Sequence, residues 1–423
     1  MKQNEKGNFV IANKKHIIKL VRLFLVIFLL LTNTISYANV EDEEQINLQE
    51  IKEETVETAI NSTEEPILNS RVALIYDRAS KKILYQKNGE KQVKMASTTK
   101  ILTAIVVLEK ANLQDVVTIN KKAAGTGGSR LGLKVNDKIT VHDLLYGLML
   151  KSGNDAAVAL AVHIGGSVEE FATMMNVKAK ELGCTNSHFV TPHGLDQEEH
   201  YTTAYELACM ADYALNIPKF REIVGTKTYT VTINNRPMVI GNTNELLGSL
   251  IGVYGIKTGF TNGAGRCLVT SCKRGELDII TVVLGADTKK IRTQDSIKLI
   301  EYAYKNYKVI NIQEIIQEKF ENWKQLNENR IYINKGVEKN IISQLEKMKY
   351  TKMAVKNTEV DNIDIEISNI FYFEAPVAEN TIIGTLKIKV KNEVVDTLTI
   401  ANKNEIRKKQ IKDYIIEFLN LIP

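Results

Sequence analysis

The spacing of apolar and polar residues divides the chain into predicted strands and helices. The runs 72–77 (VALIYD) and 82–86 (KILYQ) flank a polar turn at 78–81 and predict an antiparallel hairpin. From Ser97 to Ala111, apolar residues recur at helical spacing. The same spacing predicts further helices over 141–150, 154–164, 168–182 and 293–307. Strand-like runs are found at 229–233, 267–273 and 277–285.

Strands on both sides of a helical insert predict an α/β layered unit over residues 67–306. Beyond residue 307 the pattern changes to short alternating segments, which predict a smaller β-rich domain over 307–401. These segments are 330–333, 353–355, 363–367, 382–390 and 394–400.

A C-terminal amphipathic helix is predicted over 404–422. Its apolar face comprises Ile411, Tyr414, Ile415, Phe418, Leu419 and Ile422. Its start carries the basic residues Arg407, Lys408, Lys409 and Lys412. A basic amphipathic helix can lie in a membrane interface. Packing of this helix on its own domain is the alternative, and the sequence leaves both open.

The first 38 residues have the pattern of a secretory signal peptide. Six basic residues and one acid precede or flank an unbroken apolar run of nine residues over 23–31, and the small residues Ser36 and Ala38 follow. A membrane-spanning helix needs about 20 apolar residues, so this run is too short to be one. We therefore expect cleavage after Ala38 and a function outside the cytoplasm.

Charge is unevenly distributed along the 423 residues. Residues 39–66 hold ten acids against the single base Lys52, which predicts an acidic, disordered leader. The formal net charge of +5 resides in the signal peptide, because the rest of the chain has 49 basic and 49 acidic residues. This balance argues against a nucleic-acid partner. Four cysteines in so long a chain exclude a disulfide framework as the source of stability.

Ser97 is the one serine in the chain with a lysine three residues later, Lys100. It stands at the predicted start of a helix, where unpaired N–H groups and the positive end of the helix dipole stabilise an oxyanion. A spacing of three brings the Lys100 amine to the same face, where it can accept the hydroxyl proton if burial and a nearby cation keep it neutral. The alternative is a capping serine beside a solvated lysine.

Two further unique motifs favour the catalytic interpretation. Ser152-Gly153-Asn154 is the one Ser-x-Asn of the chain, and Lys257-Thr258-Gly259 is the one Lys-Thr-Gly. Ser152 can relay a proton to a leaving amine, and Asn154 can hold both a substrate amide and Lys100. Lys257 and Thr258 can bind a carboxylate, while Gly259 lets an extended substrate lie close to the strand. This trio in this order is the signature of penicillin-binding proteins and class A β-lactamases.

On these motifs the chain resembles the D-alanyl-D-alanine carboxypeptidases of the low-molecular-mass penicillin-binding protein family. The similarity extends to segments without evident chemistry, 191–195 (TPHGL) and 200–203 (HYTT). The resemblance implies the penicillin-recognising serine transferase fold, an antiparallel sheet flanked by helices with a helical lobe, followed by a β-rich domain and a membrane-associating helix. It implies peptidoglycan stem peptides ending in D-Ala-D-Ala as substrate, β-lactams as inhibitors, and no cofactor or metal.

The resemblance also implies roles for individual residues. Ser97 attacks the carbonyl between the two D-alanines, and the backbone N–H groups of Ser97 and Phe260 form the oxyanion hole. Arg292 occupies the position of an arginine that holds the terminal carboxylate, with a surface arginine as the alternative. Tyr254 stands where the family commonly has Asp, which puts the local strand contacts in question. The Glu-x-x-Leu-Asn segment of class A β-lactamases is missing between residues 154 and 257, so we expect slow β-lactam hydrolysis.

The same residues could serve a transpeptidase or an endopeptidase, and a non-catalytic wall-binding protein is the alternative outside the enzymes. His193 and His200 lack a metal-binding motif, so we expect them to stabilise a loop. Cys267 and Cys272 lie five apart on a predicted strand and should face opposite sides, whereas pairing of Cys184 with Cys209 stays open. Trp323, the single tryptophan, is expected at the junction of the two domains.

Overall fold

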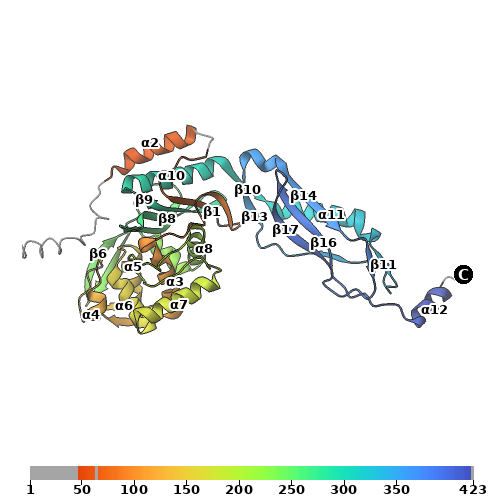
Figure 1. The fold of residues 1–423 in the computed structure, drawn as a ribbon, viewed down its shortest axis with the longest axis horizontal. Helices are drawn as coiled ribbons and strands as arrows, with labels where there is room; N and C mark the ends of the chain where they lie inside the picture. Colours follow the sequence, from red (N-terminus) through yellow and green to blue (C-terminus); the bar gives the residue numbers. More distant parts are fainter. Residues whose placement is uncertain (1–45, 62–64, 421–423) are drawn as a thin grey trace, which may run out of the picture.

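The computed structural model describes residues 46–61 and 65–420, so the predicted signal peptide lies outside the described residues. A catalytic-sized α/β domain is followed by an elongated β-rich domain, and α12 lies at the far end (Figure 1). This arrangement confirms the predicted fold class. The helices of the first domain are α2 (Leu48–Asn61), α3 (Lys100–Lys110), α4 (Lys121–Ala124), α5 (Val141–Met149), α6 (Asn154–Gly165), α7 (Val168–Glu181), α8 (Ala204–Leu215), α9 (Pro218–Val224) and α10 (Lys289–Asn306), with a 3-10 turn η2 (Ala96–Thr99).

The central sheet of the first domain is antiparallel, in the order β2-β1-β9-β8-β7. Its strands are β1 (Val72–Asp77), β2 (Lys82–Lys87), β7 (Val253–Thr261), β8 (Gly265–Arg274) and β9 (Leu277–Ala286). Two small hairpins join β3 (Val116–Thr118) with β4 (Lys138–Thr140) and β5 (Thr228–Ile233) with β6 (Arg236–Gly241). Both faces of the sheet are covered, which is why β1 is buried along its whole length.

Each face of the sheet has its own hydrophobic core. Leu74 and Val269 pack with the helical lobe that includes α3, α5 and α6. Ile75 and Leu268, their neighbours along the strands, pack with α10 on the other face. The two cysteines of β8 follow the same alternation, Cys267 in the lobe core and Cys272 in the α10 core, which confirms that they face opposite sides. All four cysteines are free.

The predicted disordered leader is wrong for residues 48–61, which form α2. Ile51 and Thr55, one turn apart, are buried, and α2 lies along α10 (Figure 1). Leu48 and Val56 pack against the same core. The acidic residues Glu53 and Glu57 stay exposed. An apolar stripe within an acidic sequence therefore provides enough buried surface to order the helix.

The β-rich domain is built on the four-stranded sheet β12-β17-β16-β14. Its strands are β10 (Tyr307–Asn311), β11 (Tyr332–Asn334), β12 (Ser343–Leu345), β13 (Lys352–Lys356), β14 (Ile363–Asn369), β15 (Tyr372–Glu374), β16 (Ile382–Val390) and β17 (Glu393–Asn402). Helix α11 (Ile312–Asn327) and the 3-10 turns η3 (Glu328–Arg330) and η4 (Asn357–Asn362) complete it.

Trp323 lies within this domain and not at the domain junction, so that prediction is wrong. Its ring stacks on Phe320 of α11, and its N–H donates to Asn369 of β14 at 3.2 Å. Both aromatic residues belong to the core of the β-rich domain. A tryptophan one turn from Phe320 on an amphipathic helix is buried by its own domain's sheet.

Helix α12 (Ile411–Leu419) is shorter than the predicted range, because residues 406 and 408 form bridges to the β-rich domain. None of the nine described side chains of α12 is buried. Among the described residues, no helix combines the length and hydropathy that a bilayer crossing requires.

Candidate active site

Ser97 lies in the 3-10 turn that leads into α3, as the motif predicted, and is buried. The turn is tightly held: the Thr98 hydroxyl donates to the Met95 carbonyl at 2.6 Å, and the Thr99 hydroxyl donates to the Ala96 carbonyl at 2.8 Å. Ala96 has a φ of +49°, a left-handed conformation that costs a non-glycine residue about 1 kcal/mol or more. The surrounding contacts therefore fix the direction of the Ser97 side chain.

The Lys100 amine joins three parts of the chain. Its Nζ lies 2.8 Å from Ser97 Oγ, 2.7 Å from Asn154 Oδ1 and 2.9 Å from the carbonyl oxygen of His193. Lys100 is fully buried. A neutral amine has two hydrogens and one lone pair. If the two carbonyl oxygens take the hydrogens, the lone pair is directed at the Ser97 hydroxyl, which is the arrangement that a general base needs.

Residues 152–154 bring the second motif to the same place. Asn154 is the first residue of α6, and its Nδ2 donates to the Gly127 carbonyl at 2.8 Å while its Oδ1 faces Lys100. Ser152 is buried with a φ of +60°, and its Oγ has no hydrogen-bond partner among the described residues. A buried hydroxyl without a partner, on a strained backbone, is a feature typical of functional sites.

The third motif lies on β7, directly beside the Ser97 turn. Lys257 and Thr258 are buried, and the Thr258 hydroxyl lies 2.6 Å from the hydroxyl of Thr243. A Cβ on Gly259 would come within 2.9 Å of the Ser97 backbone nitrogen. The strand thus approaches the nucleophile's own backbone through Gly259, a closer contact than the predicted approach of substrate.

Phe260 follows on the same strand, and the guanidinium of Arg266 lies 4.6 Å from its ring centre. The polypeptide on both sides of the Ser97 turn is therefore held by tertiary contacts. Ser97, Lys100, Asn154, Gly259 and the motifs that contain them converge, although as many as 162 residues separate them in the sequence.

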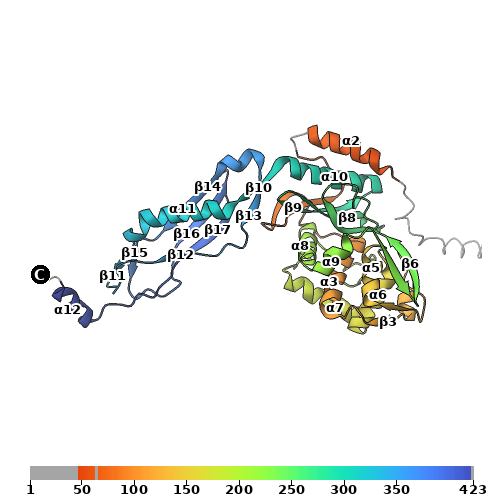
Figure 2. The same ribbon diagram turned by 180° about the vertical axis from the view of Figure 1, so that it is seen from behind.

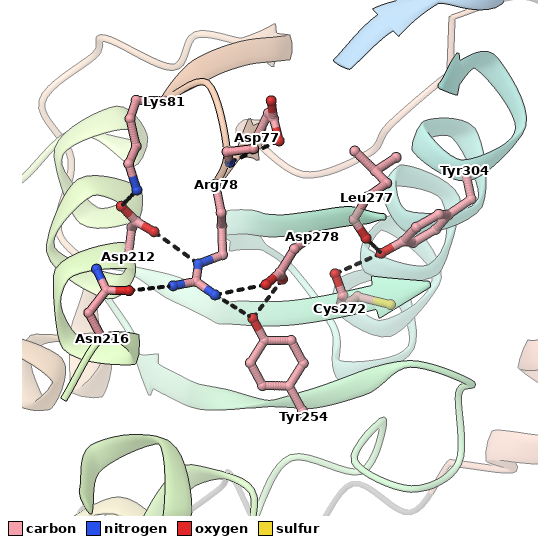
Figure 3. A network of polar contacts seen from close by, with 11 residues as sticks. Asp77, Arg78, Lys81, Asp212, Asn216, Tyr254, Cys272, Leu277, Asp278 and Tyr304 are labelled. Atoms are coloured by element: carbon pink, nitrogen blue, oxygen red, sulfur yellow. Dashed lines mark hydrogen bonds and ion pairs between the residues drawn. The ribbon is translucent and has the colours of Figure 1, made fainter. Parts of the chain in front are cut away.

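Tyr254 anchors the beginning of β7 in a polar network (Figure 3). Its hydroxyl donates to Asp278 at 2.7 Å and accepts from Arg78 at 3.0 Å. The Arg78 guanidinium also contacts Asp278, Asp212 and Asn216, so the network links β7, β9, α8 and the β1–β2 turn. The residue that departs from the family pattern therefore has well-defined strand contacts.

Arg292 is bound to a partner within the protein. It is buried in the first turns of α10, and its guanidinium pairs with Glu245, which also accepts from the Thr293 hydroxyl at 2.8 Å. Burial alone would raise the pKa of Glu245, but the charge of Arg292 outweighs burial and lowers it. Arg292 is thus neither a surface arginine nor a visibly open carboxylate site.

His193 and His200 belong to a loop that braces the catalytic turn. His200 Nδ1 accepts from the Val190 N–H at 3.1 Å, so the neutral ring carries its proton on Nε2. Nε2 lies 2.8 Å from the Thr99 hydroxyl, which already donates to Ala96 and can therefore accept. Burial lowers the pKa of His200 to about 4 and that of His193 to about 3. Both rings are neutral at pH 7, which agrees with the expected loop-stabilising role.

Two contributors to this site were not singled out from the sequence. Asp155 is buried beside Asn154, and its carboxylate accepts the backbone N–H groups of Leu131, Gly132 and Leu133 at 2.8–3.0 Å. The backbone carbonyl of His193 touches Lys100 and leaves no sequence signal at all. The acid directly after Ser-Gly-Asn was visible, but its loop partners lie more than 20 residues upstream. Within the described ranges, no group of three or more His, Cys, Asp and Glu side chains is arranged to hold a metal.

Comparisons with known proteins match the whole described assembly. The peptidase S11 family model, described as D-alanyl-D-alanine carboxypeptidase, matches residues 59–288. The D-alanyl-D-alanine carboxypeptidase DacF of Bacillus subtilis strain 168 is 33% identical over 352 residues, which cover 82% of this chain and 88% of DacF. DacC of Escherichia coli K12 is 37% identical over 269 residues, which cover 60% of this chain and 66% of DacC.

Two solved structures have the same fold. Penicillin binding protein 5 from Haemophilus influenzae superposes with a TM-score of 0.69 at 26% identity, covering 82% of this chain and 99% of that chain. The Streptomyces K15 DD-transpeptidase gives a TM-score of 0.55 at 35% identity, covering 57% of this chain and 99% of that chain. The range matched by the family model contains all three motifs but ends before Arg292.

Proposed function

The chain belongs to the peptidase S11 family of D-alanyl-D-alanine carboxypeptidases, and from this premise we propose that Ser97 is its nucleophile and Lys100 the base that activates it. The protein is a serine-type carboxypeptidase that removes the terminal D-alanine of peptidoglycan stem peptides and is acylated by β-lactams. The observation that carries the residue assignment is the position of the Lys100 amine, 2.8 Å from Ser97 Oγ and 2.7 Å from Asn154 Oδ1.

In the proposed acylation step, the Ser97 hydroxyl gives its proton to the neutral Lys100 amine as Oγ attacks the penultimate D-alanine carbonyl. The backbone N–H groups of Ser97 and Phe260 stabilise the oxyanion. Collapse of the tetrahedral intermediate breaks the C–N bond, and the leaving amine takes the proton from Lys100, relayed by Ser152. An ester on Ser97 and free D-alanine result.

Deacylation uses water in place of the departed amine. Lys100 removes a proton from the water as it attacks the ester carbonyl, and the proton returns to Ser97 Oγ when the C–O bond breaks. The unpartnered hydroxyl of Ser152 supports its relay role, because it is free to bond to a leaving amine or a water. Asn154 orients both the Lys100 amine and the substrate amide.

Recognition of the substrate's terminal carboxylate is proposed for Lys257 and Thr258. Gly259 keeps β7 close to the nucleophile. For Arg292 a direct role in carboxylate binding stays a prediction, since Glu245 already pairs with its guanidinium.

The enzyme acts on peptidoglycan and hence outside the cytoplasm. We further propose that the signal peptide is cleaved after Ala38 and that α12 contacts the outer face of the cytoplasmic membrane. The exposed apolar side chains of α12, among them Ile411, Ile415 and Phe418, support this contact over packing on the β-rich domain.

Labelling with a fluorescent penicillin tests the nucleophile. The wild-type chain should form a stable covalent adduct, and Ser97→Ala should form none. Ser249→Ala, which alters an exposed serine in the same domain, is the matched control and should label normally. An adduct on the Ser97→Ala variant would refute the assignment, and failure of the wild-type chain to label would favour the non-catalytic wall-binding alternative.

A transpeptidase is the second candidate, because the 35% identical Streptomyces K15 protein is named a DD-transpeptidase. Release of D-alanine from a pentapeptide, measured with and without a glycine-type amine acceptor, separates the two reactions. Hydrolysis should dominate, and a product in which the acceptor replaces D-alanine in most turnovers would favour the transpeptidase.

A further inference from the structure

The β-rich domain leaves a group of large aromatic and apolar side chains exposed at one end. Strands β11 and β15 pair in parallel there, with Tyr332 opposite Tyr372 and ring centres 5.9 Å apart. The exposed fractions are 59% for Tyr332, 56% for Tyr372, 53% for Ile370 and 45% for Phe371. We call these four residues the aromatic tip. Adjacent exposed apolar side chains of this size mark a contact surface.

The aromatic tip is continuous with α12. The backbone N–H of Lys409 donates to the carbonyl of Lys335, which follows β11, at 2.7 Å. The Lys409 amine lies 5.5 Å from the ring centre of Tyr414 on α12, and Tyr332 is near enough to interact with it electrostatically. Both views of the molecule show β11 and α12 at the end remote from the catalytic domain (Figures 1 and 2). The two exposed surfaces therefore form one.

We propose that the aromatic tip is a second membrane contact, which lies in the headgroup region of a phospholipid bilayer beside α12. Tyrosine suits this depth because its ring is apolar and its hydroxyl can remain hydrated. The guanidinium of Arg330 lies 5.8 Å from the Phe371 ring centre, and Lys335 flanks the pair, so basic groups are available for lipid phosphates. This inference rests on the membrane contact proposed for α12 and extends it to the folded domain.

A bilayer fits this composite surface better than another occupant. A helix of nine residues is about 14 Å long, and one short amphipathic helix anchors a protein weakly, so a second contact strengthens attachment markedly. A glycan could stack on the two tyrosines but would leave Ile411, Ile415 and Phe418 exposed to water. A lipid interface covers both surfaces at once and holds the domain by two points, which fixes its orientation.

Tryptophan substitution tests each surface separately in the chain from residue 39 to 423. Tyr372→Trp reports on the aromatic tip, Tyr414→Trp on α12, and Val239→Trp is the control on β6 of the catalytic domain, where Val239 is 72% exposed. The native Trp323 is buried and provides a constant background. Emission is recorded with vesicles of phosphatidylcholine and phosphatidylglycerol, with and without brominated acyl chains.

The inference predicts a blue shift and quenching for both Tyr372→Trp and Tyr414→Trp, and neither for Val239→Trp. A response of Tyr414→Trp alone would overturn the aromatic tip and leave the α12 contact intact, whereas no response from either would overturn both. A lipid-independent shift that grows with protein concentration, or one induced by soluble peptidoglycan strands only, would assign the surface to a second copy or to glycan and overturn the proposal.

A second measurement uses the native tryptophan background without new probes. Tyr332→Ser combined with Tyr372→Ser should weaken vesicle flotation about tenfold, while D-alanine release from a soluble pentapeptide stays unchanged. Unchanged flotation of a correctly folded double variant would contradict the proposal.

Discussion

At the scale of single residues, the catalytic turn depends on groups that never meet the substrate. His200 shows how: its ring donates to the Thr99 hydroxyl, two residues from Ser97, only while Nδ1 is free to accept from Val190. A proton added to Nδ1 would face the Val190 N–H and break this contact. The neutral state of a buried histidine is therefore part of the positioning of the nucleophile.

This state has a consequence for stability at low pH. The unfolded chain protonates His200 below its ordinary pKa of about 6.5, whereas burial lowers the pKa to about 4 in the folded protein. Between these values the unfolded state binds more protons, so stability falls with pH by about 1.4 kcal/mol per unit for this residue. We expect His200→Gln to lose about 2 kcal/mol less than wild type between pH 7 and pH 5.

Urea denaturation of both proteins at several pH values measures this difference directly. At pH 7.5 and above, both histidine states are neutral, and any offset between the two proteins reports only lost contacts. Parallel stability curves from pH 7 to pH 5 would show that His200 does not stay neutral in the folded protein.

The pair of Glu245 and Arg292 gives a second prediction at this scale. Arg292→Ala leaves the Glu245 carboxylate buried without its cation, which should cost about 3–5 kcal/mol of stability. Glu245→Gln should also destabilise, and the double variant should lose less than the sum of the two by about 0.5–3 kcal/mol.

Thermal or urea unfolding of the four proteins completes this double-mutant cycle. Additive losses would contradict the pairing. The KM for a D-Ala-terminated peptide adds a functional test, because Glu245→Gln leaves the guanidinium in place. If Arg292 binds the substrate carboxylate, this variant should lower KM.

At the scale of elements, α2 shows that an acidic segment can be part of the fold. We expect Ile51→Ala to destabilise the docking of α2 on α10 by about 2–5 kcal/mol, since Ile51 is only 2% exposed. The readout is trypsin cleavage after Lys52 together with the thermal midpoint. Glu57→Ala, on the exposed side of the same helix, is the control and should change neither. Equal cleavage of the two variants would show that α2 is not held by its apolar stripe.

Elements with strong local signals were predictable from the sequence, and those defined by distant contacts were not. Strand β16 and the helices from α5 to α7 follow from periodicity, because their buried faces repeat along the chain. The Ser97, Asn154 and Lys257 motifs identified the site because its chemistry needs those residue types. In contrast, Arg292 and Glu245 are 47 residues apart, and His200 lies 101 residues from Thr99. Pairings of this kind depend on the folded topology and leave no local pattern.

At the scale of the whole molecule, the two domains meet at the β1–β2 hairpin. The Asp77 carboxylate accepts the Ala354 N–H at 3.3 Å, the Tyr307 hydroxyl donates to the Leu84 carbonyl at 2.5 Å, and the Lys82 amine contacts the Val395 carbonyl. These contacts are mainly polar, and the two cores of the catalytic domain draw almost entirely on residues before 308. The domain contacts therefore orient the β-rich domain more than they stabilise the active site.

The last prediction follows from this division. A chain limited to residues 46–307 should fold, label with fluorescent penicillin within about threefold of the wild-type rate, and fail to float with vesicles. Its midpoint of thermal unfolding should fall by roughly 5 °C, because Ala354 no longer covers the core under α10. The Streptomyces K15 enzyme supports this expectation, since 99% of it corresponds to only 57% of this chain. A truncated protein that folds by circular dichroism but does not label would show that the β-rich domain also shapes the catalytic turn, through the hairpin at Asp77.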